Sequence, residues 1–112
     1  MLSRKVLAIA SLSTIVCSTG AFGEDFKSSK FLTYAPEAQK SYIITSVVMA
    51  GIIAGQNKPD QSTCIDRWMA DHEAAGFSSV KDAMSRFPDH HPSGVIVAVL
   101  EKACGSVKYG GK

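Results

Sequence analysis

The sequence is poor in the residues and patterns that mark a catalytic or nucleic-acid-binding protein. Its 112 residues include three cysteines without a Cys-x-x-C pair, three histidines and one tryptophan. No run of basic residues occurs, which removes the electrostatic basis for binding nucleic acid. Internal repeats and low-complexity tracts are also absent. No two carboxylates are spaced to act as an acid and a base, so we expect neither a catalytic site nor a cofactor.

Two short patterns that resemble known sites are better explained by packing. Residues 78–81 (Ser-Ser-Val-Lys) fit the S-x-x-K nucleophile motif, but the chain is short and lacks the S-D-N and K-T-G motifs that accompany it. Met49, Met69 and Met84 would suit copper, yet each lies on an apolar stripe, where methionine usually fills space in a core. We therefore expect no site at either pattern.

The first 23 residues have the composition of a secretory signal peptide. Arg4 and Lys5 form a charged start, and residues 6–16 are apolar apart from serines and a threonine. Residues 21–23 (Ala-Phe-Gly) place small side chains at the two positions that a signal peptidase reads. The sequence predicts cleavage after residue 23 and a mature periplasmic or secreted chain that begins at Glu24.

A lipoprotein signal and an uncleaved anchor are the alternatives. A lipoprotein carries a small residue directly before its modified cysteine, whereas Cys17 follows the branched Val16. A membrane anchor needs about 20 apolar residues, and the stretch before Gly20 is shorter and diluted by hydroxyl side chains. We favour cleavage, which removes Cys17 from the mature chain.

Cleavage leaves one small, electrically balanced domain over residues 24–112. The 12 basic residues fall to ten on the loss of Arg4 and Lys5 and equal the ten acidic ones. A domain this small often needs a covalent crosslink, and Cys64 and Cys104 remain in a compartment where disulfides persist. We predict a disulfide between them. It would close a loop of about 41 residues and stabilise the fold by roughly 3 to 4 kcal/mol on a chain-entropy estimate.

The apolar spacing predicts four helices and no sheet, because the one β-branched run near residues 95–100 has neither alternation nor a hairpin dipeptide. Proline at a first turn, capping side chains and terminal glycines set the limits. The expected helices span Pro36 to Gln56, Asp60 or Ser62 to Gly76, Ser79 to the residue before Pro88, and Pro92 to Gly105.

The expected fold is therefore all-α, a small four-helix domain closed by one disulfide that joins the start of one helix to the end of another. Residues 24–35 precede the first long helix and carry Phe26, Phe31, Leu32 and Tyr34, which we expect to lie across the core as an apolar arm. A flexible tail is expected from about residue 106 onward, because two glycines lie near the end of the chain.

The helix over residues 36–56 has one side made of small residues. Ala50 and Ala54 repeat at a spacing of four, as do Gly51 and Gly55, so this side is nearly smooth backbone. The favoured interpretation is a core helix against which another helix packs closely. The alternative is an interaction face for a partner or a membrane, because the helix is apolar on all sides.

Three histidines are candidates for sensing pH. His90 and His91 are adjacent and His72 lies on the preceding helix, but two adjacent histidines rarely aim at one metal ion, so we expect no metal site. Protonated imidazole near the start of the last helix would meet the positive end of the helix dipole. We therefore expect acid to destabilise that end mildly.

Two cysteine-bearing segments resemble those of a known family. The stretch from Cys64 to Met69, with Trp68 four residues after the cysteine, and the stretch from Pro92 to Cys104 are similar to segments of the HdeA/HdeB family of periplasmic acid-stress chaperones. The resemblance implies a small exported helical protein in which a disulfide links the two segments and which binds unfolding proteins at low pH.

The expected function is therefore binding of other proteins without catalysis, with an acid-stress chaperone-like role first. The alternative is a periplasmic immunity or inhibitor protein that neutralises a secreted cell-wall enzyme, because such proteins share the signal peptide, the size and the cysteine pair. A third class is a structural envelope component held by the helix over residues 36–56. Sequence alone does not distinguish the partner or the oligomeric state.

Overall fold

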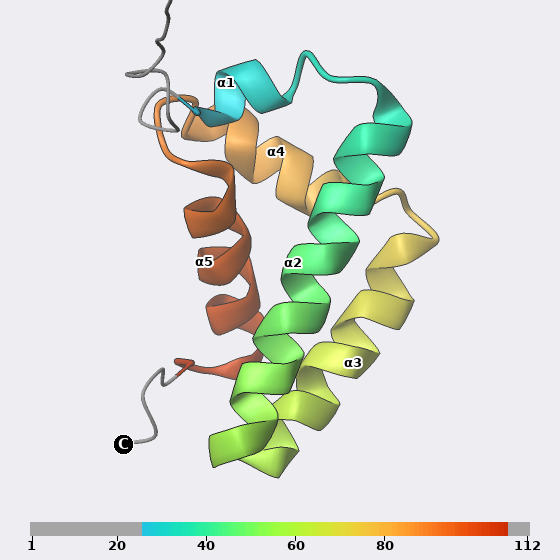
Figure 1. The fold of residues 1–112 in the computed structure, drawn as a ribbon, viewed down its shortest axis with the longest axis vertical. Helices are drawn as coiled ribbons and strands as arrows, with labels where there is room; N and C mark the ends of the chain where they lie inside the picture. Colours follow the sequence, from blue (N-terminus) through green and yellow to red (C-terminus); the bar gives the residue numbers. More distant parts are fainter. Residues whose placement is uncertain (1–25, 108–112) are drawn as a thin grey trace, which may run out of the picture.

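The protein is described by a computed structural model that covers residues 26–107 (Figure 1). This part of the chain forms five helices and no strand: α1 (Ser28–Phe31), α2 (Pro36–Asn57), α3 (Pro59–Glu73), α4 (Ser78–Arg86) and α5 (Pro92–Cys104). The predicted all-α class is confirmed, and α1 is a short helix beyond the four expected ones. The expected signal peptide lies outside the described residues, as do residues 108–112.

The long helices are arranged around α2, which runs the length of the domain (Figure 1). α3 returns antiparallel beside α2, and these two helices form the most extensive pair. α5 runs antiparallel to α3 and contacts α2, α3 and α4, while α4 crosses near the end where α1 lies. The core lies between these helices. Its largest fully buried side chains are Phe31, Ile43, Ile65, Phe77, Met84, Ile96 and Leu100.

Proline begins three of the four long helices, and one of these starts, that of α3, differs from the start predicted from sequence. Pro36, Pro59 and Pro92 all occupy the first turn, where the fixed backbone angle of proline suits a helix and its missing N–H has no helical partner to lose. The sequence predicts that α3 starts at Asp60 or Ser62, after Pro59. The structure uses Pro59 for the start itself, so Lys58 alone separates α2 from α3.

The turn between α3 and α4 also differs from expectation. α3 ends at Glu73 rather than at Gly76, and α4 begins at Ser78 without a side-chain cap, so the expected cap by Ser79 does not form. Gly76 and Phe77 both have positive φ, of 66° and 58°.

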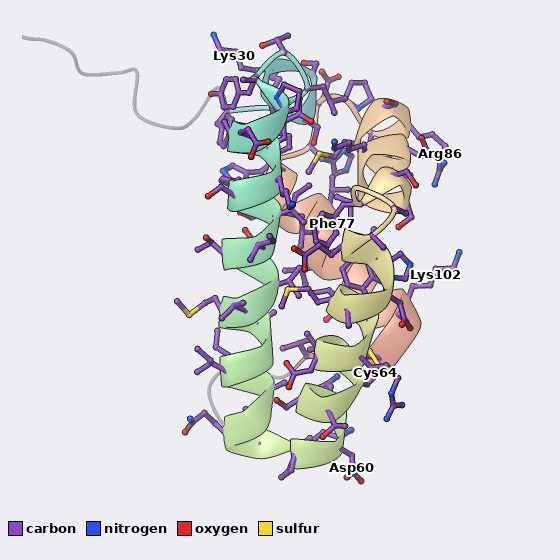
Figure 2. All side chains as sticks on the ribbon, turned by 90° about the vertical axis from the view of Figure 1, so that its right-hand side faces the viewer. Lys30, Asp60, Cys64, Phe77, Arg86 and Lys102 are labelled. Carbon is purple, nitrogen blue, oxygen red and sulfur yellow. A yellow bond between two sulfur atoms is a disulfide. The ribbon has the colours of Figure 1, made fainter. Side chains whose placement is uncertain are left out.

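Left-handed backbone costs a residue with a Cβ about 1 to 2 kcal/mol. Phe77 nevertheless adopts it, because its ring is fully buried between the helices and stacks on Trp68 at a centroid distance of 6.1 Å (Figure 2). Burial of a phenylalanine contributes about 1.5 to 3 kcal/mol, which offsets the backbone cost. A long-range contact therefore sets this helix boundary.

The segment before α2 lies over the core as the sequence predicted, and it includes α1. Phe31 is fully buried, Phe26 and Leu32 are half-buried, and Tyr34 is largely exposed. Buried Gln39 fixes the turn after α1, because its Nε2 donates to the backbone carbonyls of Leu32 and Tyr34 at 3.1 and 2.9 Å. The arm is therefore held by both apolar and polar contacts.

The described C-terminal residues are ordered beyond the expected start of the tail. Val107 is buried, and its N–H donates to the Glu101 carboxylate at 3.0 Å. Buried Gln61 of α3 donates from Nε2 to the backbone carbonyls of Cys104, Gly105 and Ser106, at 3.2, 2.8 and 2.7 Å. Residues 106 and 107 therefore have backbone partners on α3 and α5, respectively, and the flexible tail expected from about residue 106 stays a prediction.

Candidate binding surface

The outer face of α2 carries the most exposed apolar side chains on any helix of the described chain. Val48, Met49 and Ile52 are 42%, 53% and 55% exposed, and we call these three residues the α2 stripe. Val48 and Met49 are adjacent, and Ile52 lies about one helical turn further along, so the three side chains share one face. No charged residue occurs between Ser41 and Asn57, so the surroundings of the α2 stripe are also uncharged.

A shallow groove borders the α2 stripe on the side of α5. Its volume is about 330 Å³, and Met49 and Ile53 of α2 line it together with Ser93 and Val97 of α5. At the α1 end of this groove, the Tyr42 hydroxyl and the Ser93 hydroxyl are 2.6 Å apart and join the two helices. The stripe and the groove together form a continuous apolar surface that another chain could contact.

The small-residue side of α2 faces the interior. Ala50, Gly51 and Ala54 are buried, and a Cβ on Gly51 would lie 3.6 Å from the Ile65 side chain of α3. Gly55 is exposed, although a Cβ there would lie 3.5 Å from Ser62. Of the residues named from sequence as a candidate interaction face, Gly51 and Gly55 lie against α3, Ala50 lines the groove toward α5 and Ala54 is buried.

Among the described helices, α2 alone is long and apolar enough to cross a membrane by length and composition. A third of its most apolar window is buried against the rest of the domain. Insertion of α2 into a bilayer would require Ile43, Val47 and Ala54 to leave the core. We therefore treat α2 as a core helix with one exposed face.

The disulfide predicted from sequence is confirmed. Cys64 lies in the second turn of α3 and Cys104 is the last residue of α5, and their sulfurs are bonded with the Cα atoms 5.8 Å apart. The bond joins two antiparallel helices in the half of the domain opposite α1, where Cys64 is labelled in Figure 2. Gln61, one turn before Cys64, reinforces this end and was not identified from sequence, because glutamine on a helix is usually exposed.

The three histidines occupy two separate places. His90 and His91 lie in the turn before α5, whereas His72 lies near the end of α3 with its ring stacked on Trp68 at 4.2 Å. The Nδ1 of His72 is 2.8 Å from the carbonyl oxygen of Trp68. No group of three His, Cys, Asp or Glu side chains within residues 26–107 is arranged to hold a metal ion.

His91 has a structural role that depends on its protonation. It is the N-cap of α5, and its Nδ1 accepts a hydrogen bond from the Ser93 N–H at 3.1 Å. A protonated imidazole has no lone pair free at that nitrogen. The cap is therefore present while His91 is neutral and is lost once the ring is protonated. His90 instead uses its backbone carbonyl, which accepts from the Ser28 N–H and hydroxyl, each at 2.8 Å.

Comparison with protein-family models, with curated proteins and with solved structures gives no match for this chain.

Proposed function

We propose that this protein is exported and binds other proteins without catalysis, in a chaperone-like manner, through the α2 stripe. The observation that carries the proposal is the exposure of Val48, Met49 and Ile52 on an uncharged helix face. Exposed apolar area of this kind is stabilised by contact with another apolar surface, at about 25 cal/mol per Å² removed from water. The surface thus suits unfolding chains, which expose apolar segments.

The composition of the stripe favours a broad range of partners. Met49 has an unbranched, flexible side chain that adapts to partners of different shape. An uncharged surface also excludes few partners by charge repulsion, whereas specific interfaces usually contain polar or charged elements that reject wrong partners. We therefore place a chaperone-like role ahead of a dedicated inhibitor.

Acid is the proposed trigger for stronger binding. The start of α5, where the His91 side chain caps the helix, is joined to α2 by the contact between the Ser93 and Tyr42 hydroxyls, so loosening of this end would uncover apolar surface on α2. The Cys64–Cys104 bond meanwhile keeps the loosened chain compact and able to refold. Export to an oxidising compartment, where such a bond persists, is part of the proposal.

The test measures aggregation of an unrelated acid-sensitive client from pH 7 to pH 2, with and without the protein. We expect the wild type to suppress aggregation as pH falls, and the triple variant V48S/M49Q/I52S to lose most of that suppression. The matched control is A70S, because Ala70 is exposed on α3 away from the stripe. The thermal unfolding of each variant verifies that it is folded.

Four outcomes would contradict the proposal. Aggregation that is unchanged by the wild type removes the chaperone-like role, and tight binding to a single folded enzyme would favour the inhibitor. Sedimentation with lipid vesicles would favour an envelope component. Equal protection by wild type and by the triple variant would exclude the α2 stripe as the binding surface.

A further inference from the structure

A second groove lies between α4 and α5, on a part of the surface separate from the α2 stripe. Its volume is about 410 Å³. The apolar lining is formed by Ala83 of α4, by Phe87 directly after α4, and by Gly94, Val95, Ala98 and Val99 of α5. Gly94 and Ala98 are exposed, and a Cβ on Gly94 would meet nothing within 4 Å. The small residues therefore leave room for a large side chain of a partner.

Phe87 gives this groove an exposed aromatic edge. Its side chain is 49% exposed, and its ring lies edge-on to the His90 ring at 5.4 Å. Exposed aromatic residues beside a pocket are typical anchors of protein interfaces, because they bury a large area with few rotatable bonds. The groove therefore has the apolar part of a binding site.

The polar lining of the groove is entirely basic. Arg86, His90 and Lys102 line it together with the apolar residues, and no acidic side chain does so. Arg86 and Lys102 project from the same side of the molecule (Figure 2). Neither makes an ion pair within residues 26–107.

Three acidic residues lie near this basic lining in sequence, and none of them lines the groove. The Glu101 carboxylate accepts the Val107 N–H, and Asp89 pairs with Lys27 at 3.8 Å. Asp82, one turn before Arg86 on α4, is exposed and lies outside the groove lining. The rim can therefore attract anionic groups.

The basic residues lie at both ends of the groove. Arg86 is the last residue of α4 and His90 lies in the turn before α5, whereas Lys102 lies near the other end of α5. Eight residues separate Gly94 from Lys102, which corresponds to about 12 Å along a helix. A single-headed amphiphile such as a fatty acid supplies one carboxylate and would leave one end unpaired. Two anions on one segment, about two helical turns apart, match both ends.

We infer that the α4–α5 groove binds an acidic amphipathic segment of another protein. Large apolar side chains of the segment enter the groove beside Phe87, and carboxylates at its two ends meet Arg86 and Lys102. This inference goes beyond the proposed function, because it concerns a different surface and a partner of defined charge. It does not require the α2 stripe to bind clients.

The test uses a fluorescein-labelled helical peptide with two leucines four residues apart, flanked by one acidic residue at each end. Fluorescence anisotropy measures its binding to the oxidised full-length mature protein. We expect saturable binding that weakens as salt rises, because the carboxylates contact exposed cations. A peptide with lysines in place of the acidic residues should bind at least tenfold more weakly.

Two variants of the groove separate its charge from its shape. R86Q/K102Q should weaken binding at least tenfold and flatten its salt dependence, whereas A98L should block binding while keeping both cations. The charge-matched control K30Q/K58Q removes two exposed lysines outside the groove lining and should bind like the wild type. V48S/M49Q/I52S should also bind like the wild type, which keeps this test independent of the α2 stripe.

Several results would overturn the inference. Absence of peptide binding to the wild type, or equal binding to the acidic and basic peptides, removes the role of the charged rim. Unchanged binding by both R86Q/K102Q and A98L places the peptide elsewhere. Displacement of the peptide by dodecanoate at similar concentration would assign the groove to a single-headed amphiphile.

Discussion

The two ends of the domain are closed by different means. At one end, the Cys64–Cys104 bond joins α3 to α5, and Gln61 holds the backbone that follows α5. At the other end, α1 and the start of α2 are held by an aromatic cluster and by hydrogen bonds to the turn before α5. The rings of this cluster are Phe26, Phe31, Tyr34, Tyr42 and His91, with centroids 5.0 to 6.3 Å apart in the contacting pairs.

The difference determines which condition opens each end. A covalent bond persists in acid and heat but is lost to a reductant. The aromatic end depends on burial and on hydrogen bonds, so it responds to heat. One end therefore opens on reduction and the other on loss of packing.

The largest effect is expected at the aromatic end, for Phe31→Ala. Phe31 is fully buried, and truncation of a buried phenylalanine costs about 3 to 5 kcal/mol, from lost burial and the cavity left behind. The thermal midpoint should fall by well over ten degrees. Tyr34→Ala is the matched control, because Tyr34 is largely exposed in the same cluster. Equal losses for both variants would contradict the assignment of Phe31 as the anchor of this end.

Removal of the disulfide should have a comparable or slightly smaller effect. The double variant C64S/C104S should lose roughly 3 to 4 kcal/mol, because the unfolded chain regains the entropy of the open loop. Chemical denaturation with and without reductant measures this loss, and reductant should leave the double variant unchanged. Mass spectrometry of exported protein should find no free thiol and a mass that begins at Glu24. Two alkylatable thiols would refute the covalent closure of this end.

Gln61→Leu should have an intermediate effect at the disulfide end. It removes a buried donor that serves the carbonyls of Cys104, Gly105 and Ser106, and burial of unsatisfied groups costs about 1 to 3 kcal/mol. Hydrogen exchange should then increase at Val107, and Gln56→Leu on the exposed surface is the control. Unchanged exchange at Val107 would show that the Gln61 hydrogen bonds are not needed to order these residues.

The smallest effect is expected for His91→Ala, which removes the N-cap of α5 and should cost about 1 kcal/mol at neutral pH. His91→Asn keeps a capping acceptor that does not titrate near neutrality, so it should retain most of the stability. The unfolding free energy of wild type and of both variants, measured by chemical denaturation at pH 8, tests this. Equal stability of wild type and the alanine variant would show that the His91 cap contributes nothing to stability.

The sequence was sufficient for the features that depend on local pattern or on composition. Proline positions and apolar spacing predicted the long helices, and two cysteines in the mature chain predicted the disulfide. The start of α3 at Pro59 was not predicted, because proline is common both just after the end of one helix and in the first turn of another. The start of α4 after Phe77 was not predicted, because the left-handed backbone of Phe77 accompanies packing of its ring against Trp68 of α3.

The candidate binding surfaces were harder to predict. α2 is apolar on all sides, so its pattern does not distinguish the stripe at Val48, Met49 and Ile52 from the face that packs on α3. The small residues suggested an interaction face on the inner side of α2, where Gly51 lies against Ile65. The α4–α5 groove combines residues from two helices, so no single stretch of sequence contains it. The sequence named His91 only as a candidate for sensing pH, and its role as the N-cap acceptor of α5 depends on the geometry of the turn.

The disulfide also divides the chain into a covalently closed loop and an N-terminal segment that lies outside this loop. Residues 64–104 form a covalent ring that contains most of α3 and all of α4 and α5, whereas α1 and α2 lie outside it. A protease that cuts once between α4 and α5 leaves a single covalent molecule under oxidising conditions. A cut at Lys58 instead yields two fragments that are held together by noncovalent contacts alone. The fragment that carries α2 can then dissociate with its whole apolar surface exposed.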